Sequence, residues 1–281
     1  MTPRVSVHIC TKDRASEVAQ LLTSLRNQTF QNWDLILVDS SNPHPIWTFP
    51  FIANTLTRIK CEKHGLQLIR QDPPLGVCKA RNTAITEDKY QNPLICRIDD
   101  DSILEPTYLE KLTTQMNRNQ QQAAVGGIVP LWGAPPYYRN IDKATPIFNR
   151  ISFDKQGNLT MKDDGGYQYL PDLAGLPSHH LRSSFLFKRD AALEIKLFPT
   201  EYGPVGFREE TDFSLKLLQK NYALTTVTSA ICWHNICQSG GVRTPDYMEQ
   251  VQIADKKFKI KWQDAWKKGR LTQENMAVKW K

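Results

Sequence analysis

Three consecutive carboxylates, Asp99, Asp100 and Asp101, follow an apolar run that begins at Leu94. The run is typical of a buried strand, but a strand cannot bury three adjacent unpaired charges, because each would cost roughly several kcal/mol. We therefore expect the carboxylates at the end of the strand. Alternation would point Asp99 and Asp101 to one side and Asp100 to the other, so that two carboxylates converge on Mg2+ or Mn2+. The alternative is a solvated acidic turn.

A second acidic group, formed by Glu209, Glu210 and Asp212, opens a stretch with helical periodicity. Negative charge is favourable at a helix N-terminus because it interacts with the helix dipole. The spacing alone therefore favours helix-capping residues over catalytic ones. His234 ends a strand-like run, where a single histidine is more often structural than a metal ligand.

The acidic residues must be positioned by the elements around them. Apolar runs between polar turns predict strands, and apolar residues three or four apart predict helices. We expect strands near residues 5–10, 34–39, 65–70, 94–99, 124–129, 183–187 and 225–232, and helices near residues 18–25, 80–85, 107–119 and 209–218. This alternation indicates a parallel α/β sheet, whose ligands bind outside the carboxyl ends of the strands. Asp13, Asp39 and the three aspartates fall at those ends.

The composition limits the classes of partner. The net charge of +7 is concentrated at the end of the chain, since nine basic and three acidic residues lie between Asp255 and Lys281. The body is nearly neutral, no zinc-finger, RNP or helix-turn-helix pattern occurs, and we expect no nucleic-acid partner. The six scattered cysteines do not suggest disulfides. Neither a signal peptide nor an apolar run of membrane-spanning length is recognised, so we expect a cytoplasmic location.

Two common phosphate-binding motifs, GxG and GxxxxGK[ST], are missing from the sequence. Without a glycine loop to hold phosphates on backbone N–H groups, a metal ion held by carboxylates is the obvious remaining way to neutralise a diphosphate. The three aspartates offer such a site. Residues 131–180, which include Tyr137, Tyr138, Tyr167 and Tyr169, are expected to form a lid or a loop stapled to the body.

Five marks occur in an order and at spacings that resemble a known family. They are the strand and turn at 5–14, Val38-Asp39-Ser40-Ser41, the segment from Gly76 to Ala80-Arg81-Asn82, Asp99-Asp100-Asp101, and Glu209-Glu210-Thr211-Asp212. Over roughly residues 3–235 the chain resembles the inverting nucleotide-sugar glycosyltransferases of the GT-A fold, specifically glycosyltransferase family 2. The resemblance implies a Rossmann-like, mixed and mainly parallel sheet flanked by helices. It also argues against the solvated turn.

The resemblance implies roles for individual residues. The nucleotide-sugar site would comprise Thr11, Asp13, Arg14, Asp39, Arg81, Asp99 and Asp100, with Asp101 as metal ligand, His234 as a further ligand, and Glu210 as general base. Glu209 and Asp212 are the other candidates for the base. Two departures stand out: Cys10 and Lys12 replace the usual proline and aromatic of the first turn, and Glu210 replaces the more common aspartate.

The implied reaction moves a sugar from a nucleotide-diphosphate sugar, most commonly a UDP-sugar, to a hydroxyl of a saccharide, lipid-linked or other acceptor, in polysaccharide or glycoconjugate synthesis. A base deprotonates the acceptor, Mn2+ or Mg2+ stabilises the departing diphosphate, and the anomeric configuration inverts. We expect a catalytic domain at 1–245, with a nucleotide-binding half at 1–129 and an acceptor or catalytic half at 130–245.

Three other functions share parts of this pattern. A haloacid-type phosphatase also uses a D-x-D at a strand end, with the first aspartate as nucleophile, although its motif normally lies nearer the N-terminus. A sugar-nucleotide-binding module without catalysis, and a nucleotidyltransferase on a similar sheet, are the others. The fold alone does not choose between them.

The tail at 246–281 is predicted to be a basic amphipathic helix. Its apolar positions are Tyr247, Val251, Ala254, Phe258, Ala265 and Trp266, and the remaining surface is rich in lysine. Such a helix can lie on an anionic membrane, here the inner face of the cytoplasmic membrane. Alternatively, the apolar stripe packs against the catalytic body or a second subunit.

Overall fold

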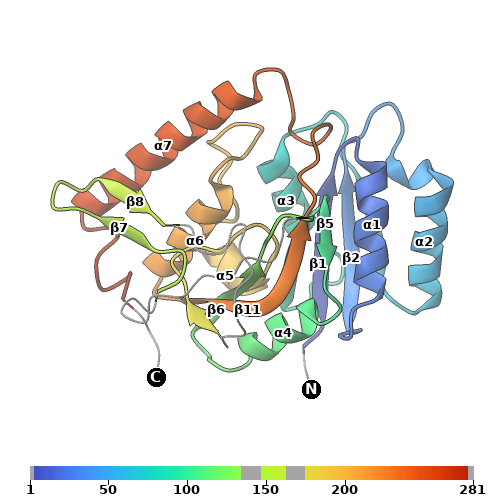
Figure 1. Cartoon of the computed structure of the whole chain (residues 1–281), viewed down its shortest axis with the longest axis horizontal. Coiled ribbons are helices and arrows are strands. Elements are labelled where there is room, and N and C mark those ends of the chain that lie inside the picture. The colour runs from blue at the N-terminus through green and yellow to red at the C-terminus, as the bar shows by residue number, and fades with distance from the viewer. Residues whose placement is uncertain (1–2, 134–146, 163–174, 278–281) are drawn as a thin grey trace.

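A mixed, mainly parallel sheet runs through the computed structural model, which describes residues 3–133, 147–162 and 175–277 (Figure 1). Its strands are β1 (Val5–Thr11), β2 (Trp33–Asp39), β3 (Leu66–Arg70), β4 (Leu94–Asp99), β5 (Ser102–Leu104), β6 (Gln122–Ile128), β9 (Leu176–Pro177), β10 (Phe185–Lys188) and β11 (Ala223–His234). The order is β3-β2-β1-β4-β10-β6-β11-β5, and β9 pairs with β11. β1 to β4 run parallel, whereas β10 is antiparallel to both β4 and β6.

Helices cover both faces of this sheet. They are α1 (Ala15–Arg26), α2 (Pro50–Cys61), α3 (Val77–Thr86), α4 (Tyr108–Met116), α5 (Arg189–Glu194), α6 (Glu209–Gln219) and α7 (Tyr247–Lys267), with a 3-10 turn η1 (Ile46–Thr48) and a small hairpin of β7 (Ile151–Phe153) and β8 (Leu159–Met161). Buried side chains of α1, α2 and α4 form one apolar cluster with the sheet, and those of α5, α6 and α7 form another. α2 and α7 lie at opposite ends of the molecule (Figure 1).

Cover on both faces explains why the central strands are almost continuously apolar. In β2, Leu35 and Leu37 belong to the cluster of α1, whereas Ile36 and Val38 pack against Ala80 and Ala84 of α3. A strand covered on one face only would alternate apolar with polar residues. The predicted strands and helices are found within a few residues of their expected bounds.

The apolar stripe of α7 faces the body of the protein. Ala254, Phe258, Trp262 and Ala265 are buried in the cluster that also contains Phe213 of α6. Trp262 was missing from the predicted stripe, and Val251 and Trp266 are only partly covered. The stripe therefore packs against the body of the protein, which is the second of the two interpretations of the sequence. It is not free to enter a membrane.

A buried carboxylate fastens α7 to α6. Asp212 accepts hydrogen bonds from the indole N–H of Trp262 at 3.0 Å and from the hydroxyl of Tyr202 at 2.6 Å, and it forms an ion pair with Lys261 at 2.6 Å. Such contacts compensate the cost of burying the charge. Within the described residues, no helix combines the length and the apolarity needed to cross a bilayer.

We expect Trp262→Ala to lower the free energy of unfolding by about 3–5 kcal/mol, because it removes a buried indole and leaves Asp212 with one donor fewer. Ile260→Ala is the control, since Ile260 is 58% exposed on the same helix and its truncation should change stability by no more than about 0.5 kcal/mol. Urea denaturation measures both. Equal effects would contradict the packing assigned to α7.

Candidate active site

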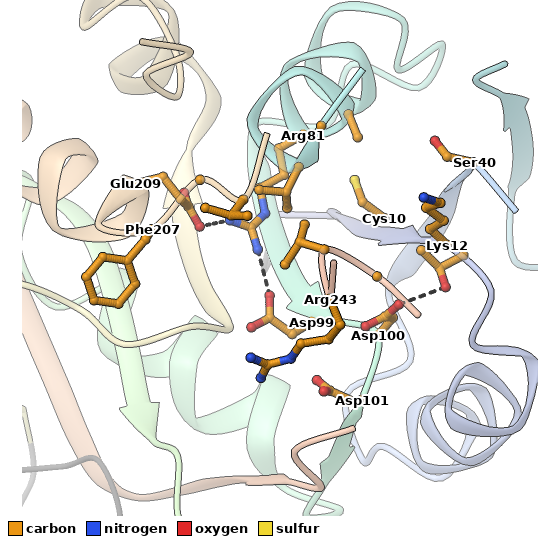
Figure 2. A pocket seen from close by; sticks show the side chains of 18 of the residues that line it. Cys10, Lys12, Ser40, Arg81, Asp99, Asp100, Asp101, Phe207, Glu209 and Arg243 are labelled. Atoms are coloured by element: carbon orange, nitrogen blue, oxygen red, sulfur yellow. Dashed lines mark hydrogen bonds and ion pairs between the residues drawn. The ribbon is translucent and has the colours of Figure 1, made fainter. Parts of the chain in front are cut away.

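A cavity of about 250 Å3 opens at the carboxyl ends of β1 and β4 (Figure 2). It is bordered by residues 10–14 after β1, residues 74–81 around the start of α3, Asp99 to Asp101, residues 205–210 at the start of α6, and His234 with residues 241–247. Segments that are distant in the sequence, including Ser40 after β2, therefore meet at one cavity. The carboxyl-end placement predicted from the strand pattern is confirmed.

Four charged side chains at the cavity wall form a closed network. Asp99 accepts hydrogen bonds from Arg81 at 2.8 Å and from Arg97 at 2.5 Å. Glu209 pairs with the same two arginines, with Arg97 at 2.6 Å. Figure 2 shows Arg81 between Glu209 and Asp99. Each charge thus has two opposite charges beside it.

This pairing explains how ions are tolerated where water is largely excluded. Burial by itself would raise the pKa of Asp99, but the charges of Arg97 and Arg81 hold that pKa well below its ordinary value. Burial lowers the pKa of Arg81, which its acidic neighbours only partly offset. Arg97 also lies over the rings of Phe185 and Phe198, at 5.3 Å and 5.8 Å. Glu209 is therefore an ionic partner inside the network.

Arg14 neutralises the other two aspartates. Its Nη1 lies 2.7 Å from Asp100 and 3.2 Å from Asp101, and its Nε donates to the carbonyl of Ser239 at 3.0 Å. Thr11 donates a hydrogen bond to Asp100 at 2.8 Å. Burial raises the pKa of Asp100 to about 6 despite the charge of Arg14. Arg14, Thr11 and Asp100 thus support the cavity floor together.

The predicted alternation of the three aspartates is wrong. β4 ends at Asp99, and the chain turns at Asp100 and Asp101 before β5 begins. Period-two alternation holds only while the backbone stays extended. As a result Asp100 and Asp101 share Arg14, whereas Asp99 lies with Arg81 and Arg97.

Asp101 and His234 meet at the cavity edge. β5 pairs antiparallel with β11, with Ser102 opposite His234, and this register places Nε2 of His234 3.2 Å from Oδ1 of Asp101. Burial by itself would lower the pKa of His234, but the hydrogen bond with Asp101 and the charge of Asp101 raise that pKa above its ordinary value. The second oxygen of Asp101 accepts from Arg14 and from the backbone N–H of Cys237.

The chemistry of this pair fits a divalent cation. Among the residues that the structure describes, no group of three or more His, Cys, Asp or Glu side chains is arranged to hold a metal. Mg2+ and Mn2+ in sites of this kind need only one or two protein ligands, because substrate phosphates and water complete the coordination. Asp101 and His234 supply a carboxylate and an imidazole, which suit that role.

Glu210 faces the cavity from the first turn of α6. It is half-buried and borders the hollow, and no ion pair with it occurs among the described residues. Arg208, two residues before Glu210, has a left-handed backbone with φ of +74°. This conformation is uncommon for residues other than glycine. This turn sends Glu209 into the arginine network and leaves Glu210 with a free carboxylate.

Asp212 does not reach the cavity. It is fully buried on the other side of α6, where Tyr202, Lys261 and Trp262 contact it. The proposed catalytic role of Asp212 is therefore replaced by a packing role. A helix turns by about 100° per residue, so Glu210 and Asp212 point in very different directions.

Asp39 and Asp13 are also turned to the backbone. Asp39 is fully buried, and its two oxygens accept the N–H groups of Ser41 at 2.8 Å and Ile46 at 2.7 Å. Asp13, with φ of +57°, accepts the N–H of Asn42 at 2.8 Å. Neither borders the cavity. Both residues shape the turns beside the cavity, and their contact with the nucleotide stays a prediction.

Several cavity residues escaped the sequence analysis. Arg97 interrupts an apolar strand, and a charge in a buried strand was a signal that it has a partner. Phe207 and Arg243 belong to loops that lack a recognisable pattern, and Tyr247 was predicted as part of the apolar stripe of the tail and not as a cavity residue. Tyr137, Tyr138, Tyr167 and Tyr169, proposed as part of a lid, lie outside the described residues.

Comparison with solved structures confirms the GT-A fold. The crystal structure of GalNAc-T7 with UDP, GalNAc and Mn2+ matches with a TM-score of 0.61 and 13% identity, over 90% of this chain and 48% of that one. The structure of S. aureus TarS 1-349 in complex with UDP-GlcNAc matches with a TM-score of 0.58 and 12% identity, over 89% of this chain and 65% of that one.

Sequence comparison gives the family. An uncharacterized glycosyltransferase of Haemophilus influenzae is 25% identical over 168 residues, which cover 53% of this chain and 49% of the relative. The match thus extends over about half the length of that relative. The model of the family described as glycosyl transferase family 2 matches residues 6–169, more than half of the chain. The chain therefore belongs to glycosyl transferase family 2.

Proposed function

We propose that this protein transfers a sugar from a nucleotide-diphosphate sugar to a hydroxyl acceptor, with inversion at the anomeric carbon. The observation that carries the proposal is the meeting, at one cavity, of the Asp101 and His234 pair with the free carboxylate of Glu210. The first can hold a cation beside a diphosphate, and the second can accept a proton from an acceptor hydroxyl.

The donor is assigned to the part of the cavity built by residues 1–129, and the acceptor to the part built by residues 130–245. Thr11, Arg14 and Asp100 support the floor of the donor side, and Arg81 and Asp99 line its wall. A UDP-sugar is the proposed donor, since the matched TarS and GalNAc-T7 structures contain UDP-GlcNAc and UDP. The acceptor class is a saccharide or a lipid-linked hydroxyl.

Asp101 and His234 are the proposed ligands of Mn2+ or Mg2+, and the Mn2+ in the GalNAc-T7 structure supports this choice. When bound, the cation would offset the negative charge that develops on the departing diphosphate. Arg14 and the backbone N–H of Cys237 hold the second oxygen of Asp101 and so orient the carboxylate.

Glu210 is the proposed general base. Because Glu209 is occupied by two arginines and Asp212 by α7, Glu210 alone among the three acidic candidates has a carboxylate free to take a proton. The arginine network keeps the negative charge of Glu209 from adding to that of Glu210. The network also fixes the start of α6, and with it the position of the base.

The rival phosphatase mechanism has less support. It needs the first aspartate of the motif as a nucleophile, but the carboxylate of Asp99 is held by Arg81 and Arg97.

A panel of UDP-, dTDP- and GDP-sugars with Mn2+ or Mg2+ tests the proposed function through release of nucleoside diphosphate. Release of inorganic phosphate from simple esters, or of pyrophosphate from nucleoside triphosphates, would contradict it, as would binding without turnover.

We expect Glu210→Gln to keep the fold and the UDP affinity but to lower kcat about 100-fold or more, since it removes a positioned base. Glu110→Gln is the matched control, because Glu110 lies in the first turn of α4, far from the cavity. Steady-state kinetics and thermal melting measure both variants. A lower melting temperature with normal turnover would show that Glu210 is a helix cap.

Asp101→Ala should abolish the dependence of UDP binding on Mn2+, because it removes one of two protein ligands and a charge that holds the cation. Calorimetric titration with UDP, in Mn2+ and in EDTA, measures the effect. Asp72→Ala, at an exposed position, is the control and should bind as the parent does. Unchanged affinity of the Asp101 variant in Mn2+ would refute the metal assignment.

The outward face of α7 is the surface proposed for peripheral membrane contact. Ile253 and Ile260 are 46% and 58% exposed there, beside Lys256 and Lys257. Apolar and basic side chains on one helix face suit an anionic bilayer surface. The available charge is limited, because Lys259, Lys261 and Lys268 form ion pairs with neighbouring acidic residues.

Sedimentation with phosphatidylserine vesicles tests this contact. Lys256→Glu with Lys257→Glu should reduce sedimentation at low salt, since each lysine near such a surface contributes about 1 kcal/mol, and high salt should release the parent. Lys60→Glu with Lys63→Glu on the α2 side is the control. Equal sedimentation of all forms would exclude the membrane role, and self-association seen by analytical ultracentrifugation would assign the face to a second copy.

A further inference from the structure

The segment that joins β11 to α7, residues 235–246, borders the cavity through Gly241, Val242 and Arg243; we call it the strap. It is fastened to the turn after β1: the N–H of Gly241 donates to the carbonyl of Lys12 at 2.7 Å, and Arg14 donates to the carbonyl of Ser239 at 3.0 Å. Gly240 and Gly241 both have positive φ. A Cβ atom at Gly240 would lie 2.7 Å from the carbonyl oxygen of Asp13, so only glycine fits so closely.

The strap brings Arg243 into the cavity. Its backbone N–H closes a turn on the carbonyl of Gly240 at 3.0 Å, and its guanidinium lies 4.3 Å from the ring centre of Tyr247, the first residue of α7. Both residues border the hollow. In Figure 2 the side chain of Arg243 extends into the cavity on the side of Asp99 and Asp101.

Arg243 differs from the other arginines of the cavity in its charge balance. Arg14, Arg81 and Arg97 are paired with the carboxylates of the floor and wall, and Arg208 with Asp255 of α7 at 2.7 Å. For Arg243, no carboxylate lies within ion-pair distance among the described residues. A half-buried guanidinium that faces a cavity without a carboxylate partner has its donors available for an anion.

We propose that Arg243 binds the diphosphate of the donor nucleotide on the side of the cavity bordered by the strap. The planar fork of a guanidinium matches two phosphate oxygens, which favours Arg243 over the point charge of Lys12 for this contact. Tyr247 holds the guanidinium plane, and the two glycines hold the strap. The inference rests on the proposed function, because it assigns a contact within the same donor site.

The test compares one pair of ligands that differs in phosphate number, UDP and UMP, and one pair that differs in the presence of uridine, UDP and pyrophosphate. UDP, UMP and inorganic pyrophosphate are titrated calorimetrically in Mn2+ into the full chain, Arg243→Gln, Arg243→Lys and the exposed control Arg118→Gln. Arg243→Gln should lower the affinity for UDP and for pyrophosphate about 10- to 100-fold, as expected for loss of charge-assisted hydrogen bonds. The same variant should lower the affinity for UMP by less than about threefold. The affinities of Arg243→Lys should be intermediate, and those of Arg118→Gln should equal those of the parent.

Unchanged binding of UDP and pyrophosphate by Arg243→Gln would overturn the assignment, and so would an equal loss for UMP and UDP, which would indicate a displaced strap. The outcome for the proposed function is separate. A parent chain that binds pyrophosphate but not UDP would refute the uridine donor while the Arg243 comparison still holds. A parent that binds neither would refute both.

Discussion

Three adjacent carboxylates at the end of a buried strand need positively charged side chains beside them, and this requirement organises the site. Arg14 from the start of α1, Arg81 from α3 and Arg97 from β4 itself provide the compensation. Because unpaired charges in such a position would cost several kcal/mol each, the segments that carry the arginines are held together at the carboxyl ends of the strands. The cavity is the space that these segments enclose.

The acidic residues of the chain divide into two kinds once their partners are known. Asp99, Asp101, Glu209 and Asp212 each form ion pairs with basic side chains. Glu210 borders the cavity and forms no ion pair among the described residues. A general base at pH 7 has to be of the second kind, since a carboxylate already held by two guanidinium groups is a weak base.

The strap, α7 and the contacts of Asp212 connect the proposed metal ligand to the helix that carries the proposed base. From His234 the strap crosses to the turn after β1, α7 follows, and Asp212 fastens α7 to the helix that begins with Glu209 and Glu210. α7 thus packs into the body of the protein. Its contribution to the core explains why its apolar stripe is turned inward while its lysines remain at the surface.

The longer strands, their carboxyl ends and the family could be predicted from the sequence, because apolar runs that end in polar turns are local features and the motifs keep their order; the short strands β5 and β9 could not. The sequence also placed Asp99 to Asp101 correctly beside the cavity. Which carboxylates remain free depends on tertiary packing, because Glu209 and Glu210 are neighbours in the sequence that differ in what packs against them. The contact of His234 with Asp101 likewise depends on the register of β5 against β11, a long-range pairing that no local pattern records.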